Sequence, residues 1–493
     1  MSAVVASPPA AIDRSVLDRS LFWALAYTGG VKWLAQAFAW ASTLVVARLL
    51  TPEDYGLVSM ATVYIGMITL VNEFGLGTAV ITRRDLSNHA LAQLNSLAVM
   101  VGLAALAVSC AAAEPLARFF EAPALRWVVI IMSLGFVMSA FQTVPGAILQ
   151  KELRFKWLAF LEGWQAAIIG ASMVLLAFLG FRYWTLVLGN LLGTAFTVAM
   201  VLSKRSHGFA WPRLRELGAA LALSRHVALG RLAWYAQTNA DFVVAGRVLG
   251  QAALGAYGIG WTLASVPVDK ISAVVARVTP AFFSAVQTDL AAVRRYLLLL
   301  TEALALVTIP LALGVALAAD DIVLLLLGEK WRAVIGPLRL LAVLASLRPI
   351  VSLLSPILNA TGHSRFSMYK GVLDAIVLGA AFWLGSRWGT VGIAAAWLIA
   401  YPVLVVPVYW YAFRCIGMAA GEYVRVLGPA LSASCVMAAA MVALRALLPD
   451  TLTLTLRVLI EASACAAVYL TVIMTMRRDR MRTIVRFLRE RSA

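Results

Sequence analysis

Two basic residues lie well inside apolar segments of the sequence, and either could bind an anion. Lys32 and Arg231 stand 199 positions apart, each surrounded by apolar residues. In a bilayer, a buried cation is costly unless it faces a partner or a polar cavity. A guanidinium suits phosphate in particular, because its planar fork can bind two oxygens at once. The pattern therefore predicts an internal site for an anionic substrate.

Polar side chains follow both cations at helical spacing. Gln36 follows Lys32 by one turn, and Trp234 and Asp241 continue the face that begins at Arg231. Two polar stripes at matching positions predict a water-filled, substrate-binding cavity. The alternative is structural: Lys32 reaches toward the membrane surface, and Arg231 pairs with Asp241 to hold helices together.

A further pair of cations and two acids belong to the same hypothesis. Lys270 and Arg277 are seven residues apart and therefore share one helical face, although Lys270 could instead pair locally with Asp269. Glu73 and Asp241 are candidates to bind a coupling proton or sodium ion, because a buried carboxylate can be neutralised during a transport cycle. Other charged residues within apolar segments are secondary candidates: Arg339, Arg348, Glu162, Asp374, Glu302 and Glu461. For Glu162 and Asp374 we expect a position near the headgroups.

Residue patterns typical of enzymes and metal sites are missing from the sequence. The four cysteines have no paired spacing, and the four histidines are scattered, so we expect no metal site and no disulfide frame. There is no Gly-rich phosphate loop or nucleophile elbow. The sequence therefore predicts that the protein is not an enzyme and has no resident cofactor.

The composition requires a membrane protein. Apolar residues make up 62% of the chain and charged residues 13%, whereas roughly a quarter of residues are charged in soluble domains. Apolar windows predict fourteen spans, at about 21–47, 55–80, 91–113, 124–149, 157–180, 183–202, 221–249, 255–283, 296–318, 333–359, 368–388, 391–413, 424–447 and 452–476.

The basic residues predict the orientation. Lysine and arginine are concentrated on the side of the membrane that carries both termini, which is therefore expected to be cytoplasmic. The net charge of +17 needs no nucleic-acid partner, because the basic tail at 477–493 suits anionic membrane lipids.

An internal repeat divides the chain. Arg48–Gly56 lines up with Arg247–Gly255 at an offset of 199, and Pro145–Phe155 with Pro356–Phe366 at an offset of 211. The expected domains are an N-terminal lobe of six helices (1–202), a cytoplasmic linker (203–220), a C-terminal lobe of six helices (221–413), two further helices (414–476) and the tail.

Four stretches resemble a known family. Ala47–Leu57, Phe74–Ile81, Gln150–Phe155 and Asn239–Arg247 are similar to segments of the polysaccharide-exporting flippases of the multidrug/oligosaccharidyl-lipid/polysaccharide (MOP) superfamily, in the branch of Wzx-like lipopolysaccharide and exopolysaccharide exporters.

The resemblance implies an all-α polytopic membrane protein of about fourteen transmembrane helices, with two pseudo-symmetric six-helix lobes plus two C-terminal helices. It also implies alternating access that moves an undecaprenyl-diphosphate-linked oligosaccharide across the bacterial inner membrane for exopolysaccharide or O-antigen assembly. The implied driving force is an H⁺ or Na⁺ gradient or the membrane potential, and the implied partners are the polymerase and chain-length proteins of polysaccharide assembly.

Three alternatives stay open on the sequence. A cation-coupled multidrug exporter of the same fold would favour an acidic and aromatic cavity. A peptidoglycan lipid-precursor flippase would need nearly the same chemistry as an oligosaccharide flippase. A membrane glycosyltransferase or polymerase would need catalytic carboxylates or a histidine in periplasmic segments, and the predicted periplasmic connections are short.

Overall fold

The computed structural model describes most of the chain, namely residues 36, 38–72, 76–82, 86–212, 232, 234–285, 289–360, 364–449 and 451–476. Lys32, Glu73 and Arg231 lie outside these ranges, and so does the basic tail. Arg277 has a described backbone, but its side chain lies outside the described part.

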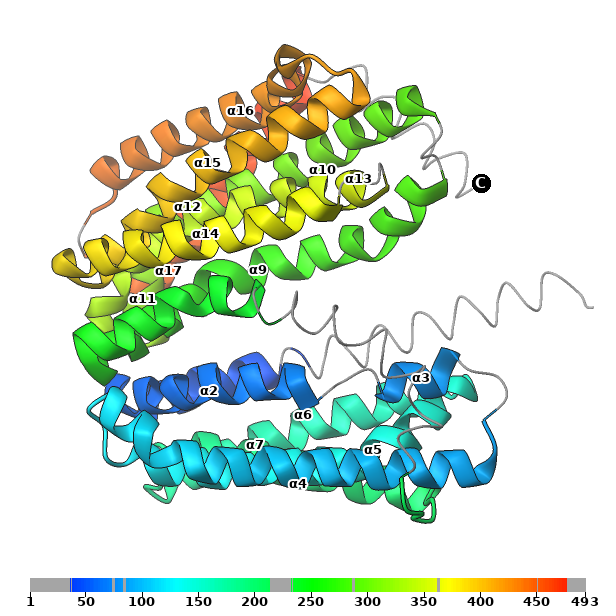
Figure 1. The fold of residues 1–493 in the computed structure, drawn as a ribbon. Coiled ribbons are helices and arrows are strands. Elements are labelled where there is room, and N and C mark those ends of the chain that lie inside the picture. Colours follow the sequence, from blue (N-terminus) through cyan, green and yellow to red (C-terminus); the bar gives the residue numbers. More distant parts are fainter. Residues whose placement is uncertain are drawn as a thin grey trace, which may run out of the picture. The chain divides into compact units, whose positions relative to one another are not determined.

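The described chain is helical, and no strand occurs within it (Figure 1). The first half contains a helix at Phe38–Leu49 and then α2 (Pro52–Asn72), α3 (Leu76–Thr82), α4 (Asn88–Phe119), α5 (Leu125–Lys151), α6 (Phe155–Phe178) and α7 (Trp184–Lys204). The second half contains a helix that begins at Trp234 and then η1 (Ala245–Leu249), α9 (Gly250–Ala285), α10 (Leu290–Leu317), α11 (Ala319–Leu326), η2 (Glu329–Val334), α12 (Ile335–Ser352), α13 (Leu354–Ala360), α14 (Ser364–Gly385), η3 (Ser386–Trp388), α15 (Gly389–Ile416), α16 (Ala420–Leu447) and α17 (Leu454–Met476).

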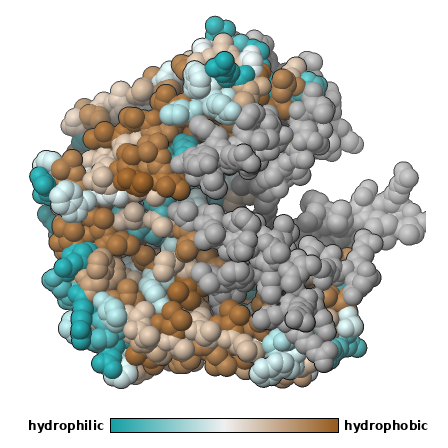
Figure 2. All heavy atoms as spheres, in the orientation of Figure 1, coloured by the Kyte–Doolittle hydropathy of each residue, from teal (hydrophilic) through white to brown (hydrophobic). Residues whose placement is uncertain are grey.

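Ten helical stretches among the described residues are long and apolar enough to cross a membrane. Two of them, Trp234–Ala273 and Lys370–Ile416, run for 40 and 47 residues, and each overlaps two of the spans expected from the sequence. Apolar side chains also cover much of the visible described surface (Figure 2). The protein is therefore a multi-pass membrane protein, while the number fourteen stays a prediction.

The helices form two compact units. One contains residues 1–49, 75–107 and 133–221, and the other contains residues 50–74, 108–132 and 222–493. The second unit includes α2, because α2 packs along α9. The lobes expected from the repeat, 1–202 and 221–413, have other boundaries than these two units, and they stay a prediction.

In the first unit, small residues let helices approach closely. A Cβ on Gly189 would lie 2.4 Å from the Met173 side chain, and one on Gly193 would lie 2.2 Å from Ile169. Because apolar lipid gives helices no hydrophobic reason to associate, close packing of this kind is a main source of their attraction. The glycines of α7 thus hold it against α6.

The segment that follows α7 lies across the start of α4. The Ala210 amide is 3.1 Å from Ser96 Oγ, and the Asn95 side-chain amide is 3.4 Å from the His207 carbonyl. The ring of Phe209 meets Phe141 edge-on at 6.3 Å. Residues 205–212, which we call the α7 loop, are therefore held in place by backbone and aromatic contacts.

In the second unit, α2 begins at a capped turn. The amide and hydroxyl of Thr51 each lie 3.1 Å from a carboxylate oxygen of Asp54, and Pro52 occupies the first helical position. Asp54 is consequently 3% exposed. The acidic group exposed at this end of α2 is Glu53.

The repeated glycines of the sequence meet where α2 crosses α9. A Cβ on Gly56 would lie 1.7 Å from the Gln251 carbonyl oxygen, and a Cβ on Gly255 would lie 1.9 Å from the Pro52 carbonyl oxygen. Only glycine permits backbones to come this close. The two copies of the repeat therefore contact each other through equivalent positions.

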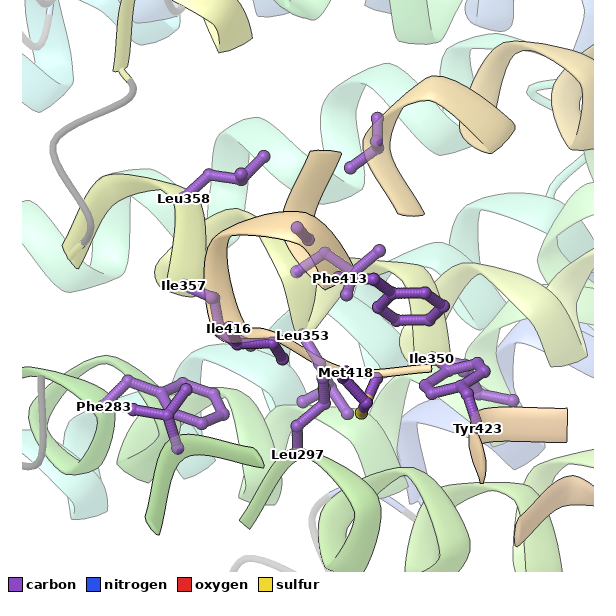
Figure 3. Packing of buried hydrophobic residues seen from close by; sticks show 14 of the residues in the cluster. Phe283, Leu297, Ile350, Leu353, Ile357, Leu358, Phe413, Ile416, Met418 and Tyr423 are labelled. Carbon is purple, nitrogen blue, oxygen red and sulfur yellow. The ribbon is translucent and has the colours of Figure 1, made fainter. Parts of the chain in front are cut away.

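A large apolar core joins α9, α10, α12, α13, α15 and α16. Figure 3 shows Phe283, Leu297, Ile350, Phe413 and Tyr423 among its members, and all of these are buried. This core fixes the positions of the helices around the polar groups described next.

An ionic network attaches the C-terminal helices. Arg445 of α16 donates two hydrogen bonds of 2.9 Å to Glu461 of α17 and is paired with Asp321 of α11. It also donates to the Leu317 carbonyl at 2.8 Å. Glu461 is 1% exposed, and its charge is compensated by Arg445 together with Arg457, whose Nε lies 3.4 Å from Glu461 Oε1.

Candidate functional site

Asp241 is the most deeply buried acid of the candidate site. Its side chain has no exposed surface, and Oδ2 accepts hydrogen bonds of 2.7 Å from the Tyr257 hydroxyl and from Trp397 Nε1. Oδ1 accepts a 3.0 Å bond from the Phe242 amide. Three donors replace the water that a carboxylate would otherwise need. Asp241 thereby ties its own helix to α9 and α15.

A second acid lies in α14. Asp374 is paired with Lys370, one turn away, and accepts a 3.1 Å hydrogen bond from Gln237 Nε2. It is 6% exposed, and its Oδ1 is buried without a described hydrogen-bond partner. The sequence had suggested a position near the headgroups for this residue. A lysine and an amide hold it among the helices, and its depth in the membrane stays a prediction.

Aromatic rings surround Asp241. Trp397 lies between Phe382 and Trp261, with ring centres 5.0 and 5.9 Å away, and Tyr401 is also 5.9 Å from it. Phe242 packs edge-on against Tyr257 at 5.5 Å. These residues come from four helical segments, so the cluster exists only once α9, α14 and α15 have assembled around the helical segment at 234–244.

One cation borders the aromatic cluster. The guanidinium carbon of Arg348, in α12, lies 5.0 Å from the centre of the Trp261 ring. A cation over the face of an indole is attracted by the negative charge of the ring face. The site therefore combines an acid with three donors, a stacked arginine and several aromatic surfaces.

Proton uptake by Asp241 would disturb this arrangement. A carboxylate accepts hydrogen bonds with both oxygens, whereas a carboxylic acid must donate with one of them. A proton on Oδ2 would face the Trp397 indole N–H and a proton on Oδ1 the Phe242 amide, and both of these groups can only donate. A change of charge at Asp241 is thus linked to the packing of α15 against α9.

The structure describes only some of the residues that the sequence proposed for a substrate cavity. Gln36 is partly exposed near the start of the described chain, and Trp234 is 59% exposed. Lys270 is exposed on α9. Lys32, Arg231 and Glu73 are outside the described residues, as is the side chain of Arg277. Their joint assignment to one cavity stays a prediction.

Sequence reasoning missed the partners of Asp241. Tyr257 and Trp397 look like ordinary interfacial or core aromatics, and they lie 16 and 156 positions away from Asp241. Lys370 offered a signal, because it precedes Asp374 by one helical turn. Arg348 was a secondary candidate, and its contact with Trp261 gives it a defined position.

Comparison with solved structures defines the fold of the protein. The fold is similar to that of the lipid II flippase MurJ in its inward closed conformation, with a TM-score of 0.73 and 14% identity over 92% of this chain and 99% of that chain. An inward-facing multidrug resistance transporter of the MATE family matches with a TM-score of 0.61 and 17% identity over 78% of this chain and 94% of that chain. The chain thus has the MOP-superfamily fold.

Sequence comparison then identifies the family. The family described as "Polysaccharide biosynthesis protein" matches residues 45–336, and the chain belongs to it. The lipopolysaccharide biosynthesis protein WzxC of Escherichia coli (strain K12) is 25% identical over 414 residues, which cover 78% of this chain and 82% of that protein. The succinoglycan biosynthesis transport protein ExoT of Rhizobium meliloti (strain 1021) is 26% identical over 425 residues, or 82% of this chain and 81% of that protein. The family resemblance expected from the sequence is confirmed.

Proposed function

We propose that this protein is a flippase for lipid-linked oligosaccharides. It moves undecaprenyl-diphosphate-linked repeat units from the cytoplasmic to the periplasmic leaflet, for exopolysaccharide or lipopolysaccharide O-antigen assembly. The observation that carries the proposal is the family match over residues 45–336, on a chain with the MOP fold. Relatives named for lipopolysaccharide biosynthesis and succinoglycan transport support it.

The physical problem in this task is the diphosphate. Isolated charges are very costly in the hydrocarbon core, so the headgroup needs a wet path with compensating cations while the polyprenyl chain stays in lipid. Basic residues within or beside the spans, such as Arg348 in α12 and the cavity candidates Lys32, Arg231, Lys270 and Arg277, suit that role. The protein acts as a transporter and not as an enzyme.

Asp241 is our candidate for ion coupling, and Glu73 is the second candidate. A proton or sodium ion that changes the charge of Asp241 would alter its bonds to Tyr257 and Trp397, which belong to two different helices. This offers a route from an ion gradient to helix movement. The membrane potential alone is the alternative source of energy.

The proposed location is the bacterial inner membrane, with both termini in the cytoplasm. The positive-inside distribution of lysine and arginine supports this orientation. The proposed partners are membrane lipids and the polymerase and chain-length proteins that use the flipped repeat unit.

The test is the pool of lipid-linked oligosaccharide in a strain that lacks the gene. Accumulation of a repeat unit that is protected from a periplasm-confined hydrolase is the expected result, and a plasmid copy of the gene should reverse it. If lipid-linked peptidoglycan precursors accumulate instead, the protein is a precursor flippase, an outcome consistent with its MurJ-like fold. An unchanged pool with heightened sensitivity to cationic drugs would establish the multidrug alternative.

A further inference from the structure

Arg348 occupies an unusual place for a cation. It lies in α12, within the apolar stretch Glu329–Leu358 that is long enough to cross the membrane. The residue is partly exposed, and within the described part of the chain no acceptor forms a hydrogen bond or salt bridge with it. An arginine that faced lipid at this depth would be strongly unfavourable. Water or a polar ligand is the environment that suits its exposed part.

The nearby acid forms no hydrogen bond with Arg348. Asp241 is close enough for Arg348 to act on it through charge, but its three hydrogen-bond donors are Tyr257, Trp397 and its own neighbour Phe242. The guanidinium is not among them. Among the described residues, none accepts a hydrogen bond from the five N–H donors of Arg348, while the face of Trp261 holds the guanidinium plane.

A stacked guanidinium is well suited to a diphosphate. Stacking fixes the plane and leaves the edge, where the N–H groups point, free to bind two oxygens. A lysine at the same place would supply the charge without the fixed fork. The indole that supports Arg348 belongs to α9, and its neighbour Trp397 belongs to α15, so a ligand bound there would touch helices that also bind Asp241.

We propose that Arg348, stacked on Trp261, is a binding site for the diphosphate of the lipid-linked substrate. Arg348 contacts the phosphate oxygens, and Trp261 is a positioning residue that orients the guanidinium. The proposal rests on the flippase function and adds a phosphate-binding position in the C-terminal half of the chain, on α12.

The experiment measures binding to the full-length protein in lipid nanodiscs. The probe is geranylgeranyl diphosphate, and geranylgeraniol, which has the same chain without phosphates, is the reference ligand. Arg348→Gln should weaken the binding of the diphosphate by about tenfold, equivalent to about 1.4 kcal/mol, and leave geranylgeraniol unchanged. The matched control is Arg332→Gln, in η2 of the same apolar stretch, where the arginine is already paired with Glu329. It should bind as the wild type does.

Two further variants keep the proposal open to refutation if Arg348→Gln does not fold. Arg348→Lys retains the charge, and Trp261→Phe retains an aromatic surface. Each should weaken binding of the diphosphate by about threefold, because each loses part of the fixed geometry. Unchanged affinity in both would overturn the proposal.

A purely electrostatic role beside Asp241 gives a different result. In that case Arg348→Gln would lower thermal stability, Asp241→Asn would restore it, and the folded protein would bind the diphosphate with unchanged affinity, which would overturn the proposed site. If the wild type and Arg348→Gln prefer the diphosphate to geranylgeraniol equally, the proposed site at Arg348 is wrong and the flippase function stands. If the wild type does not prefer the diphosphate, the proposed site and the flippase function are both wrong.

Discussion

At the scale of single residues, the hydrogen bond from the Tyr257 hydroxyl to Asp241 can show whether Asp241 is charged, because its strength depends on that charge. A hydrogen bond to a charged group contributes about 1.5–3 kcal/mol, against about 0.5–1.5 kcal/mol for a neutral pair. Tyr257→Phe removes only the hydroxyl from a fully buried ring. We expect the free energy of unfolding to fall by about 1.5–3 kcal/mol, measured by titration with a denaturing detergent and followed by circular dichroism.

Tyr469→Phe is the matched control for this measurement. The Tyr469 hydroxyl donates to the neutral Leu306 carbonyl at 2.6 Å, so its loss should cost about 0.5–1.5 kcal/mol. In an Asp241→Asn background, the effect of Tyr257→Phe should shrink toward that of the control. Equal losses for the two tyrosines in the wild-type background would mean that Asp241 does not carry a charge in the folded protein.

At the scale of elements, the crossing of α2 and α9 depends on two glycines. A methyl group at Gly255 would lie 1.9 Å from the Pro52 carbonyl oxygen and 2.8 Å from the Gly56 amide nitrogen, so the helices would have to separate. Overpacking of this kind costs about 1–3 kcal/mol. Gly255→Ala should therefore lower the free energy of unfolding by that amount in the same detergent titration.

Gly258→Ala provides the comparison on the same helix. A Cβ there would lie 3.5 Å from its nearest neighbours, an ordinary contact distance. Because alanine also favours the helical conformation by up to about 1 kcal/mol over glycine, this variant should be neutral or slightly stabilising. Similar losses at both positions would show that the glycines serve the helix itself and not the crossing.

The α7 loop should respond to pH through His207. Burial, and then the positive charge of Arg205, lower the pKa of the imidazole below its usual 6.5, while Glu152 acts in the opposite direction. The released loop therefore binds a proton more readily than the docked loop. Docking keeps its full stability above pH 6.5 and loses stability as the pH falls below that value toward the lower pKa of the docked imidazole.

Hydrogen exchange at the Ala210 amide measures this docking, because that amide is bonded to Ser96 when the loop is in place. After correction for intrinsic exchange rates, its protection should decrease between pH 7 and pH 5. His207→Gln should remove the pH dependence, and His89→Gln, which changes a histidine at the start of α4, should retain it. A flat profile in the wild type would exclude His207 as the sensitive group.

At the scale of the whole molecule, the sequence predicted the class of fold and parts of its plan. The apolar windows predicted helices that the structure contains, because spans of this length and hydropathy have few other conformations in a bilayer. The repeat at offset 199 was visible through Gly56 and Gly255. That these two glycines contact each other was not predictable, because a repeat gives equivalence of positions and not their distance.

The residues of the candidate site were predictable from the sequence only where a charged residue lies in an apolar span. Asp241 stood out as an acid in an apolar span, and Arg348 as a cation in another, whereas Tyr257 and Trp397 carry no such conflict. Asp54 shows the opposite case. Its carboxylate is buried because the Thr51 and Asp54 pattern of a capped helix start engages it.

The orientation of the chain in the membrane can be tested with two cysteine replacements. Glu53, at the start of α2, and Ser206, in the α7 loop, are both exposed. They are separated by α2, α4, α5, α6 and α7, so the two positions lie on opposite sides if each of these helices crosses. Lys151, Arg154 and Lys204 share the side of Ser206, which the positive-inside rule assigns to the cytoplasm.

In a background without the four native cysteines, a membrane-impermeant maleimide added to whole cells should label Glu53→Cys and leave Ser206→Cys unmodified. Permeabilised cells should label both, which shows that each thiol is accessible. Labelling of Ser206→Cys alone in whole cells would reverse the orientation. A reversed orientation would place the basic loops in the periplasm, against the positive-inside rule.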